Sequence, residues 1–505
     1  MFELKHEIFK EVCRIGDDGV VEFATYSAGG WVFGESFIEV RSPINNEVIA
    51  RVSKLNGEQL EEAIDAVYTK GREAIRNFPG EKRIKAFLKA ARLMREAFDD
   101  FTRVLMLDAG KPLSNAKGEV MATIERLEKT TMESRRLLGD YIPGDWSEET
   151  LESEGIVKRE PYGVVLAISP YNYPLFISAA KVIPALLSGN AVLLKPASLD
   201  PIAPLLFIRV LELSGLPRES FALLTIAGRD MDRVVANKRI RAITFTGSTE
   251  VGEHLLKTGG IKAYHMELGG KDPAIVLDDA DLETTVEKLI KGMVSYSGQR
   301  CDAIRIIFAE KEIYENLKDM LVERLRGIDP KNPLEDENAI MGPLIDEKSA
   351  VTIEELYRDA VGKGAKPLTE FKRRGNYVWP VLLEVRKETL PKLRAFQEDV
   401  FGPLTLLVRV KNEDEAVELA NSSRFGLDAA VFSTNDARAR KVARRLEVGA
   451  VFINEFPRHG IGYYPFGGMK DSGIGREGIG YSIEQFTTTK TIVRNYREYG
   501  VWEYI

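Results

Sequence analysis

The sequence predicts an α/β protein in which mostly parallel sheets carry helices on both faces. Short apolar runs recur from residue 163 onward, and segments with the spacing of amphipathic helices separate them. A strand buried on both faces reads as a continuous apolar run, and parallel neighbours need a helical crossover between them. At 505 residues the chain is longer than one hydrophobic core supports, so we expect at least two domains.

The first alternating region ends near residue 271. Its expected strands and helices are, in order, "GVVLAIS", "LFISAAKVIPALLSG", "AVLLK", "IAPLLFIRVLELSG", "FALLTIAG", "MDRVVANK", "RAITFTGS" and "TEVGEHLLKTG". Residues 162–180 are uncharged over a length that resembles a membrane span, but Pro170, Asn172 and Pro174 interrupt them. A bilayer core would leave the disturbed backbone groups unsatisfied, so we expect a buried strand followed by a helix.

The second alternating region follows "MELGG". It contains "PAIVLDD", "DLETTVEKLIKGMVSYSG", "AIRIIFAE" and "IYENLKDMLVERLRG", and then "LTLLVRV", "EDEAVELANSS", "AAVFST", "DARARKVARRLEVG" and "AVFIN". Two α/β domains that meet near residue 271 are therefore expected.

Two segments lie outside this alternation. Residues 139–160 hold turn residues and polar β-prone positions, and "FTTTKTIVRNYREY" at 486–499 is a lone β-prone run. Unpaired strands promote aggregation unless something covers them. Either a partner subunit covers these strands or they form an ordinary surface hairpin.

Composition excludes several classes of function. The net charge of −7 and the pI near 5.6, without a long basic block, argue against nucleic acid and anionic membranes as partners. Two cysteines cannot form a disulfide framework, and the N-terminal stretch lacks the apolar core of a secretory signal, so we expect a reducing, cytoplasmic location. The four histidines have no metal-ligand spacing, so no metal site is expected. Scarce glutamine beside abundant Glu, Lys and Arg is typical of thermophiles.

Cys301 in "SGQRC" is a candidate nucleophile. A cation beside a thiol favours the reactive thiolate, so Arg300 and a helix terminus are expected to activate it. The alternative is a buried core thiol, since free cysteine is among the most buried residue types.

Glu267 and Asn172 are candidate helpers of this thiol. Glu267 in "HMELGG" lies between apolar residues before a Gly-Gly turn, where burial would raise its pKa as a general base requires. Asn172 in "SPYNYP" follows a parallel strand, where α/β sheets bind ligands, and its amide is able to donate to an oxyanion. The alternatives are a solvated glutamate and a turn asparagine.

A dinucleotide site is predicted at two further strand ends. Lys195 ends the strand in "LLKPAS", while Gly247 and Ser248 in "TFTGSTEVG" lead into a helix N-terminus, which attracts phosphate. The spacing from Gly247 to Gly252 is GxxxxG, which differs from the GxGxxG dinucleotide fingerprint. No acid occupies the first turn after Lys195, where Ser198 lies, so a 2′-phosphate would meet less repulsion there.

Together and in this order, the motifs resemble the aldehyde dehydrogenase superfamily over nearly the whole chain. They are "SPYNYP", "LLKPAS", "FTGSTEVG", "MELGGKDPAIVLDDADL", "SGQRC", "EDVFGP", "FINE" and "PFGGMKDSGIGREG". The resemblance implies the aldehyde dehydrogenase fold, with a Rossmann-like cofactor domain (1–138 and 161–271), an α/β catalytic domain (272–480) and a β oligomerisation arm (139–160 and 481–505). It also implies a homotetramer.

The resemblance assigns roles position by position. Cys301 would attack the aldehyde carbon, Asn172 would bind the oxyanion, and Glu267 would activate the water that hydrolyses the thioester. The implied NADP contacts, with NAD as an alternative cofactor, are Lys195, Ser198, Gly247, Ser248, Pro170, Tyr171, Leu268, Asp399 and Phe401. Asp399 stands where the family usually has Glu, with Glu398 beside it, and Asp302 stands where the family commonly has a small or apolar residue.

Within the superfamily the chain is most similar to archaeal non-phosphorylating glyceraldehyde-3-phosphate dehydrogenases, through "GDYIPGDW", "YSGQRCDAI" and "PRHGIGYYPFGG". That implies substrate-phosphate contacts from Arg300, Arg458 and Tyr173. Arg126 is a looser candidate whose alternative is a solvated helix charge. The implied reaction oxidises D-glyceraldehyde 3-phosphate to 3-phosphoglycerate without inorganic phosphate. The alternatives are another anionic aldehyde, such as succinic semialdehyde, and a catalytically silent nucleotide-binding relative.

Overall fold

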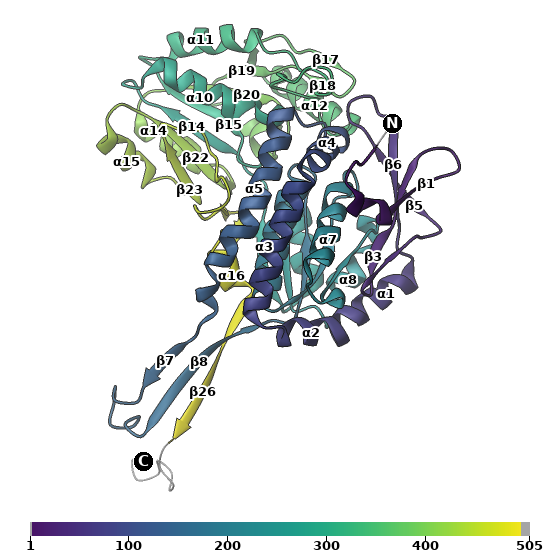
Figure 1. Ribbon diagram of the computed structural model, residues 1–505. Coiled ribbons are helices and arrows are strands. Elements are labelled where there is room, and N and C mark those ends of the chain that lie inside the picture. The colour runs from purple at the N-terminus through teal and green to yellow at the C-terminus, as the bar shows by residue number, and fades with distance from the viewer. Residues whose placement is uncertain (1–2, 496–505) are drawn as a thin grey trace.

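Two large sheets organise the chain, and a computed structural model describes residues 3–495 of it (Figure 1). One has six strands, the other seven. Their helices form two bodies joined side by side, and a narrow three-stranded sheet projects from them.

The six-stranded sheet is the first alternating region of the sequence. Its order is β11-β10-β9-β12-β13-β25, and only β25 is antiparallel to its neighbour. The strands are β9 (Val164–Ile168), β10 (Ala191–Lys195), β11 (Phe221–Leu223), β12 (Ala242–Thr246), β13 (Ala263–Glu267) and β25 (Gly473–Ile474). Strands β9, β10, β11 and β12 are buried throughout, as expected for continuous apolar runs covered on both faces.

Helical crossovers join these parallel strands. They are α6 (Pro174–Leu187), α7 (Ile202–Ser214), the short α8 (Asp232–Val235) and α9 (Thr249–Gly259). The uncharged stretch at 162–180 is thus a strand that runs into α6, as predicted, and Pro174 occupies the first turn of the helix, where its missing N–H costs nothing. Within residues 3–495 no helix is long and apolar enough to cross a membrane.

Residues before 139 form strands and helices that the sequence patterns did not predict. A four-stranded sheet contains β1 (Cys13–Ile15), β2 (Val21–Phe23), β5 (Phe37–Arg41) and β6 (Val48–Ser53), and a hairpin contains β3 (Thr25–Ser27) and β4 (Gly30–Val32). The helices are α1 (Gly57–Ala66), α2 (Arg72–Asn77), α3 (Gly80–Glu96), α4 (Phe98–Asp108) and α5 (Leu113–Met132). Most of these strands are short and only partly buried, so they leave a weak apolar signal.

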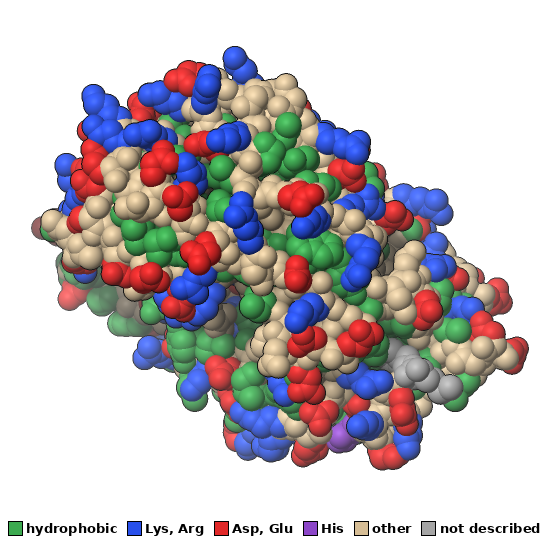
Figure 2. Space-filling model, turned by 90° about the horizontal axis from the view of Figure 1, so that it is seen from above, with side chains coloured by type: hydrophobic (Ala, Val, Ile, Leu, Met, Phe, Trp, Pro, Cys, Tyr) green, Lys and Arg blue, Asp and Glu red, His purple; other side chains and the backbone are tan. Residues whose placement is uncertain are grey.

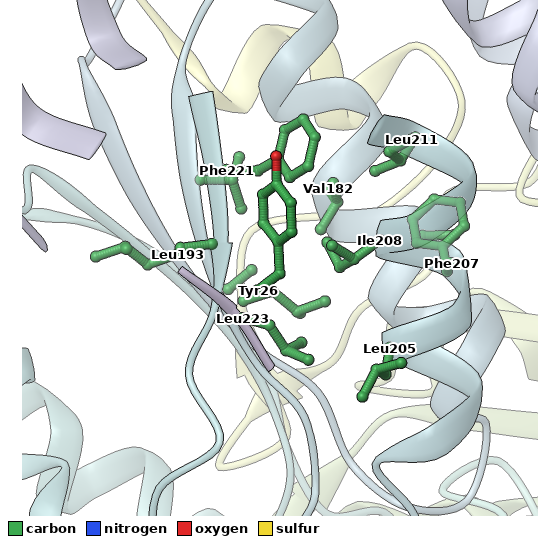
Figure 3. Close-up of a cluster of buried hydrophobic side chains, with 14 of the residues drawn as sticks. Tyr26, Val182, Leu193, Leu205, Phe207, Ile208, Leu211, Phe221 and Leu223 are labelled. Carbon is green, nitrogen blue, oxygen red and sulfur yellow. The ribbon is translucent and has the colours of Figure 1, made fainter. Parts of the chain in front are cut away.

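A shared core ties this N-terminal part to the six-stranded sheet (Figure 3). Tyr26 of β3 stacks on Phe221 of β11, with ring centroids 5.2 Å apart, and its hydroxyl donates to the Arg218 carbonyl at 3.1 Å. Val182 of α6 and Ile208 of α7 lie beside the Tyr26 ring in Figure 3. Burial of one large aromatic among aliphatic side chains stabilises this junction.

The seven-stranded sheet is the second alternating region. Its order is β16-β19-β20-β15-β14-β22-β23, and only β16 is antiparallel. The strands are β14 (Asp272–Val276), β15 (Ile304–Glu310), β16 (Lys366–Pro367), β19 (Val381–Val385), β20 (Leu404–Val410), β22 (Asp428–Phe432) and β23 (Ala450–Ile453). Its helices are α10 (Leu282–Val294), α11 (Tyr314–Arg326), α12 (Glu347–Gly362), α13 (Arg394–Gln397), α14 (Glu413–Asn421) and α15 (Asp436–Ala443).

The β-prone run near the C-terminus is not a lone strand. It forms β26 (Thr487–Asn495), which pairs along its length with β8 (Ser153–Pro161), and β8 pairs on its other side with β7 (Asp140–Pro143). Chain segments far apart in sequence therefore build one sheet, which projects beyond α16 (Tyr481–Gln485) in Figure 1. The final part of the expected arm, 496–505, lies outside the described residues.

Candidate active site

The carboxyl ends of four neighbouring parallel strands carry most of the predicted cofactor residues. Lys195 lies opposite Ile168, Ile168 opposite Phe245, and Thr246 opposite Glu267. The loops that follow these strand ends hold Pro170, Tyr171, Asn172, Ser198, Gly247, Ser248 and Leu268. They leave the same edge of the sheet, which is where open α/β sheets bind ligands.

Cys301 lies between α10 and β15 of the other sheet, after a strained turn. Tyr296 and Ser297 adopt left-handed backbone angles, with φ of 50° and 56°, which non-glycine residues rarely adopt. The Tyr296 hydroxyl donates to the Ala109 carbonyl at 2.9 Å, and the Ser297 hydroxyl donates to the Gly342 carbonyl at 2.8 Å. These two bonds hold the turn that sets the position of Cys301.

Gly269 and Gly270 carry the chain from β13 into β14 beside this turn. A Cβ atom on Gly270 would lie 2.4 Å from the Cys301 carbonyl oxygen, and one on Gly269 would lie 2.9 Å from Asp399 Oδ2. The contact at Gly270 is with backbone, which cannot move aside, so this position requires glycine, whereas the Asp399 side chain near Gly269 is able to shift. The Gly-Gly pair thus brings the ends of the two sheets into contact.

A cavity of about 310 Å³ opens at this junction. Its wall includes the predicted nucleophile, base and four substrate-binding residues: Cys301, Glu267, Arg300, Arg458, Tyr173 and Arg126. Asn172 is not part of the wall. Its Oδ1 accepts the Tyr173 N–H at 3.1 Å, and its Nδ2 has no hydrogen-bond partner within residues 3–495, so the amide N–H groups remain free to donate.

Neighbouring groups oppose the expected activation of Cys301 by Arg300. The Arg300 guanidinium donates from Nη2 to Asp302 Oδ2 at 2.8 Å and to the Pro457 carbonyl at 2.7 Å, so its charge is already compensated. Burial, and then the carboxylates of Asp302 and Glu267, raise the pKa of the Cys301 thiol well above its usual range. Residues 301–302 form a turn before β15, so no helix begins at Cys301 itself.

Glu267 is a buried carboxyl with a raised pKa, in the direction that a general base requires. Burial, and then the negative charge of Glu477, raise that pKa. Two contacts partly offset the increase: the Thr246 hydroxyl donates to Oε2 at 2.7 Å, and the Lys181 ammonium lies 3.7 Å from the same oxygen. Glu267 Oε1 has no hydrogen-bond partner among the described residues, which leaves one oxygen free for a proton.

Lys181 and Glu477 lie beside the predicted base, Glu267, and the sequence analysis predicted no role for either of them. Lys181 is fully buried in the otherwise apolar α6, and its ammonium also lies 3.4 Å from Glu477. A single charge within an apolar helix was the available signal, because a buried lysine requires a partner.

His265, Glu267 and Glu477 form a buried group of three potential metal ligands in the described chain. The Lys181 ammonium lies within 4 Å of both carboxylates. A cation at this position would be repelled by Lys181, so the group is better described as an ion-pair network around the base.

The predicted phosphate contacts differ in burial. Arg300 is 5% exposed, and Arg458 lies at the rim, where 62% of its side chain is exposed and it pairs with Glu455 at 2.9 Å. Arg126 is 1% exposed and donates to the Ile461 carbonyl at 2.8 Å. It is therefore a buried cavity residue, and its alternative interpretation as a solvated helix charge is wrong.

The predicted cofactor residues surround the same edge of the six-stranded sheet. Lys195 is 8% exposed and has no ion pair or hydrogen bond within residues 3–495, and burial lowers its pKa to about 8. Ser248 caps α9 by accepting the Val251 N–H at 3.4 Å. Phe401 contacts Tyr171 edge to face, with centroids 5.7 Å apart.

Of the two neighbouring acids, Asp399 is the one at the site. It lies against Gly269, and burial raises its pKa. Glu398 is exposed and binds Arg394 at 2.7 Å and 3.1 Å on the outer side of the loop. A ribose contact, if made from this loop, would therefore come from the shorter side chain.

One of two mainly parallel sheets has strand ends of the kind that bind nucleotides, and a cavity containing a cysteine lies where the two sheets meet. These features define the class as an α/β enzyme with a nucleotide-binding type of sheet. Residues 31–492 match the aldehyde dehydrogenase family. The chain belongs to the aldehyde dehydrogenase family, and the predicted fold is confirmed.

Individual relatives cover nearly the whole chain. It is 36% identical to the NADP-dependent glyceraldehyde-3-phosphate dehydrogenase of Streptococcus equinus over 94% of this chain and 98% of the relative. It is 34% identical to the lactaldehyde dehydrogenase of Methanococcus maripaludis over 92% and 98%. The crystal structure of the NADP-dependent glyceraldehyde-3-phosphate dehydrogenase from Bacillus halodurans C-125, complexed with NADP, superimposes with a TM-score of 0.90 at 35% identity, over 94% and 99%.

We predict that Cys301 reacts slowly with iodoacetamide in the cofactor-free protein at pH 7. A raised pKa leaves little thiolate, so alkylation should be roughly tenfold or more slower than that of free cysteine and should accelerate as the pH rises. Peptide mass spectrometry distinguishes Cys301 from Cys13. Asp428→Asn, which removes a nearby buried charge that also raises this pKa, should speed the reaction. Equal or faster alkylation than free cysteine in the wild type would refute the electrostatic argument.

Proposed function

We propose that this aldehyde dehydrogenase oxidises D-glyceraldehyde 3-phosphate to 3-phosphoglycerate with NADP and without inorganic phosphate. The observation that carries the proposal is the set of three arginines, Arg126, Arg300 and Arg458, in the wall of the cavity that contains Cys301. A phosphate dianion needs more than one cationic partner to replace its water, and guanidinium offers paired donors. Similarity to the streptococcal and Bacillus enzymes supports the same substrate and cofactor.

In the proposed reaction the Cys301 thiol first loses its proton to solvent. The thiolate Sγ then bonds to the aldehyde carbon, and the carbonyl oxygen becomes an oxyanion. The free amide of Asn172 donates to that oxygen and stabilises the developing charge. Bound NADP supplies the acceptor for the hydride that the thiohemiacetal loses. The resulting thioester keeps the acyl group on Cys301 until water cleaves it.

Glu267 completes the turnover by accepting a proton from the attacking water. The unpaired Oε1 is the oxygen that would accept this proton, because Oε2 already accepts the Thr246 hydroxyl and lies near the Lys181 ammonium. The carboxylate form acts as the base, and its raised pKa means that this form increases as the pH rises through the neutral range.

The residues present fit NADP. Lys195 is a nearly buried ammonium that forms no ion pair among the described residues, although the charge of Asp200 acts on it, and a 2′-phosphate would supply a direct anionic partner. The N-terminus of α9, at Gly247 and Ser248, offers backbone N–H groups to the other phosphates. No acidic side chain follows Lys195 in the first turn to repel the 2′-phosphate.

A second candidate substrate is lactaldehyde, which the similarity to the methanococcal enzyme favours. Lactaldehyde lacks a phosphate, so the two proposals differ in what the arginines contribute. A comparison of phosphorylated and unphosphorylated aldehydes distinguishes them.

We propose that the projecting sheet is an oligomerisation arm in a cytoplasmic homotetramer. Both it and its connecting loops expose apolar side chains: Tyr141, Ile142, Trp146, Leu151, Ile156, Ile492 and Val493. Contiguous exposed apolar surface of this kind marks an interface. The cofactor and catalytic domains would then correspond to the two large sheets, with the boundary between Lys271 and Asp272. On the face in Figure 2 acidic and basic side chains are interspersed, which offers no basic surface to nucleic acid.

We predict that Glu267→Gln retains one burst of reduced cofactor per active site and then turns over about 10²- to 10⁴-fold more slowly than the wild type. The amide cannot accept the water proton, whereas the steps on Cys301 precede that need. Rapid-mixing absorbance measures both phases. In the wild type, the hydrolytic rate should rise with pH. Wild-type turnover by Glu267→Gln at pH 7 would assign the base elsewhere.

We predict that the Kd for NADP increases above pH about 8, because neutral Lys195 cannot pair with the 2′-phosphate, by up to about tenfold per pH unit. Lys195→Arg should flatten this dependence, since guanidinium remains charged. Fluorescence titration with NAD is the matched control, because NAD lacks that phosphate. An equal increase in the Kd values for NAD and NADP would show that Lys195 does not contact the 2′-phosphate.

We predict that Arg458→Ala raises the KM for glyceraldehyde 3-phosphate roughly tenfold, or about 1.4 kcal/mol, since a rim arginine is partly screened by solvent. Unphosphorylated glyceraldehyde should change little, because it lacks the group that Arg458 would contact. Arg440→Ala, which removes an exposed arginine outside the cavity, is the control. Equal losses for both aldehydes would make Arg458 structural and locate the phosphate site elsewhere.

A further inference from the structure

Asp302 is an acid in the cavity wall directly after the nucleophile. Only 12% of its side chain is exposed. Its Oδ2 accepts the Arg300 guanidinium at 2.8 Å, while its Oδ1 has no hydrogen-bond partner within residues 3–495. One carboxylate oxygen is therefore tethered and the other is free.

This acid opposes two requirements of the proposed reaction. Its charge helps to raise the pKa of the Cys301 thiol, and its bond to Arg300 reduces the attraction of that guanidinium for an anionic substrate. A residue that works against its own site usually serves another function there. Its free oxygen indicates what that function is.

We propose that Asp302 Oδ1 accepts a hydrogen bond from a hydroxyl on the carbon next to the aldehyde carbon, so that the enzyme selects 2-hydroxyaldehydes. Because Cys301 bonds to the aldehyde carbon, the adjacent residue is well placed to meet the substituent on the next carbon. An ionised carboxylate is an acceptor only, and its bond to a hydroxyl is charge-assisted. This inference rests on the proposed function, and both of its candidate substrates carry that hydroxyl.

The other acidic groups of the cavity wall are committed elsewhere. Glu119 binds Lys111 and accepts the N–H groups of Leu175 and Phe176. Glu477 is paired with Lys181, and Glu267 is the proposed base. Glu267 also has an unpaired oxygen, but the proposed reaction uses it for the proton of the attacking water, so Asp302, next to Cys301, is the carboxylate that we assign to a substrate hydroxyl.

The test compares lactaldehyde with propionaldehyde, which differ only in that hydroxyl and carry no charge. For the wild type we expect kcat/KM to favour lactaldehyde by at least roughly tenfold. In Asp302→Ala the ratio of the two kcat/KM values should fall roughly 10- to 100-fold, and in Asp302→Asn, which keeps a polar side chain, it should fall less. Effects through Arg300 or the thiol act on both aldehydes alike and cancel in the ratio.

Asp428→Asn is the matched control. Asp428 is fully buried outside the cavity wall, where it holds His459 of that wall at 2.6 Å, and it also raises the pKa of Cys301. Asparagine retains an oxygen for the His459 bond, so this variant changes the charge near the thiol and keeps that contact. In Asp428→Asn the ratio of kcat/KM for lactaldehyde to kcat/KM for propionaldehyde should equal that of the wild type. An equal fall in both variants, or a ratio in Asp302→Ala within about twofold of the wild type, would overturn the proposal.

Two further measurements distinguish a failure of this inference from a failure of the variant to fold and from a failure of the proposed substrate. If Asp302→Ala does not fold, Asp302→Asn and the wild-type preference decide, and a wild type that oxidises both aldehydes equally well refutes the selection. The preference for a phosphate is measured independently, with glyceraldehyde 3-phosphate against glyceraldehyde. If the wild type shows no preference for the phosphorylated aldehyde but still prefers lactaldehyde to propionaldehyde, the proposed phosphorylated substrate is rejected and the inference about Asp302 stands.

Discussion

The close passage of Gly269 and Gly270 between the two sheets is the constraint on which the active site depends. A side chain on either glycine would collide with the Cys301 carbonyl or with Asp399. Because β13 ends at Glu267 and β14 begins at Asp272, this short step joins the base on one sheet to the sheet that supplies the nucleophile. The proposed base and nucleophile, Glu267 and Cys301, lie 34 positions apart in sequence and thereby face one cavity.

The apolar runs and turn motifs were sufficient to predict the parallel sheets, their crossovers and the strand ends that gather at the site. The spacing of apolar residues indicates which segments are buried, and the end of each apolar run indicates where its strand ends. Charge compensation was not predictable, because the pairing of Arg300 with Asp302 and with the Pro457 carbonyl depends on side-chain geometry. The burial of Arg126 was missed for the same reason, since the loop near Ile461 that covers it is remote in sequence. The short N-terminal strands gave too little pattern to be recognised.

Buried carboxylates give the cofactor-free protein a protected nucleophile. Thiolates oxidise and alkylate far faster than thiols, so a raised pKa at Cys301 limits damage while no substrate is present. The cost is a smaller reactive fraction at neutral pH. The same preference for the uncharged form at Glu267 means that both the nucleophile and the base favour a protonated resting state.

The pairing of β26 with β8 has a consequence for biosynthesis. Strand β8 ends at Pro161, whereas its partner begins at Thr487, so the ribosome completes both large sheets before the arm can close. Until then β8 presents an open edge on the nascent chain, which is an aggregation hazard that β26 removes late. If subunits join through this sheet, they associate only after β26 has been made, and the arm would act as a checkpoint for chains that have been translated at least as far as this strand.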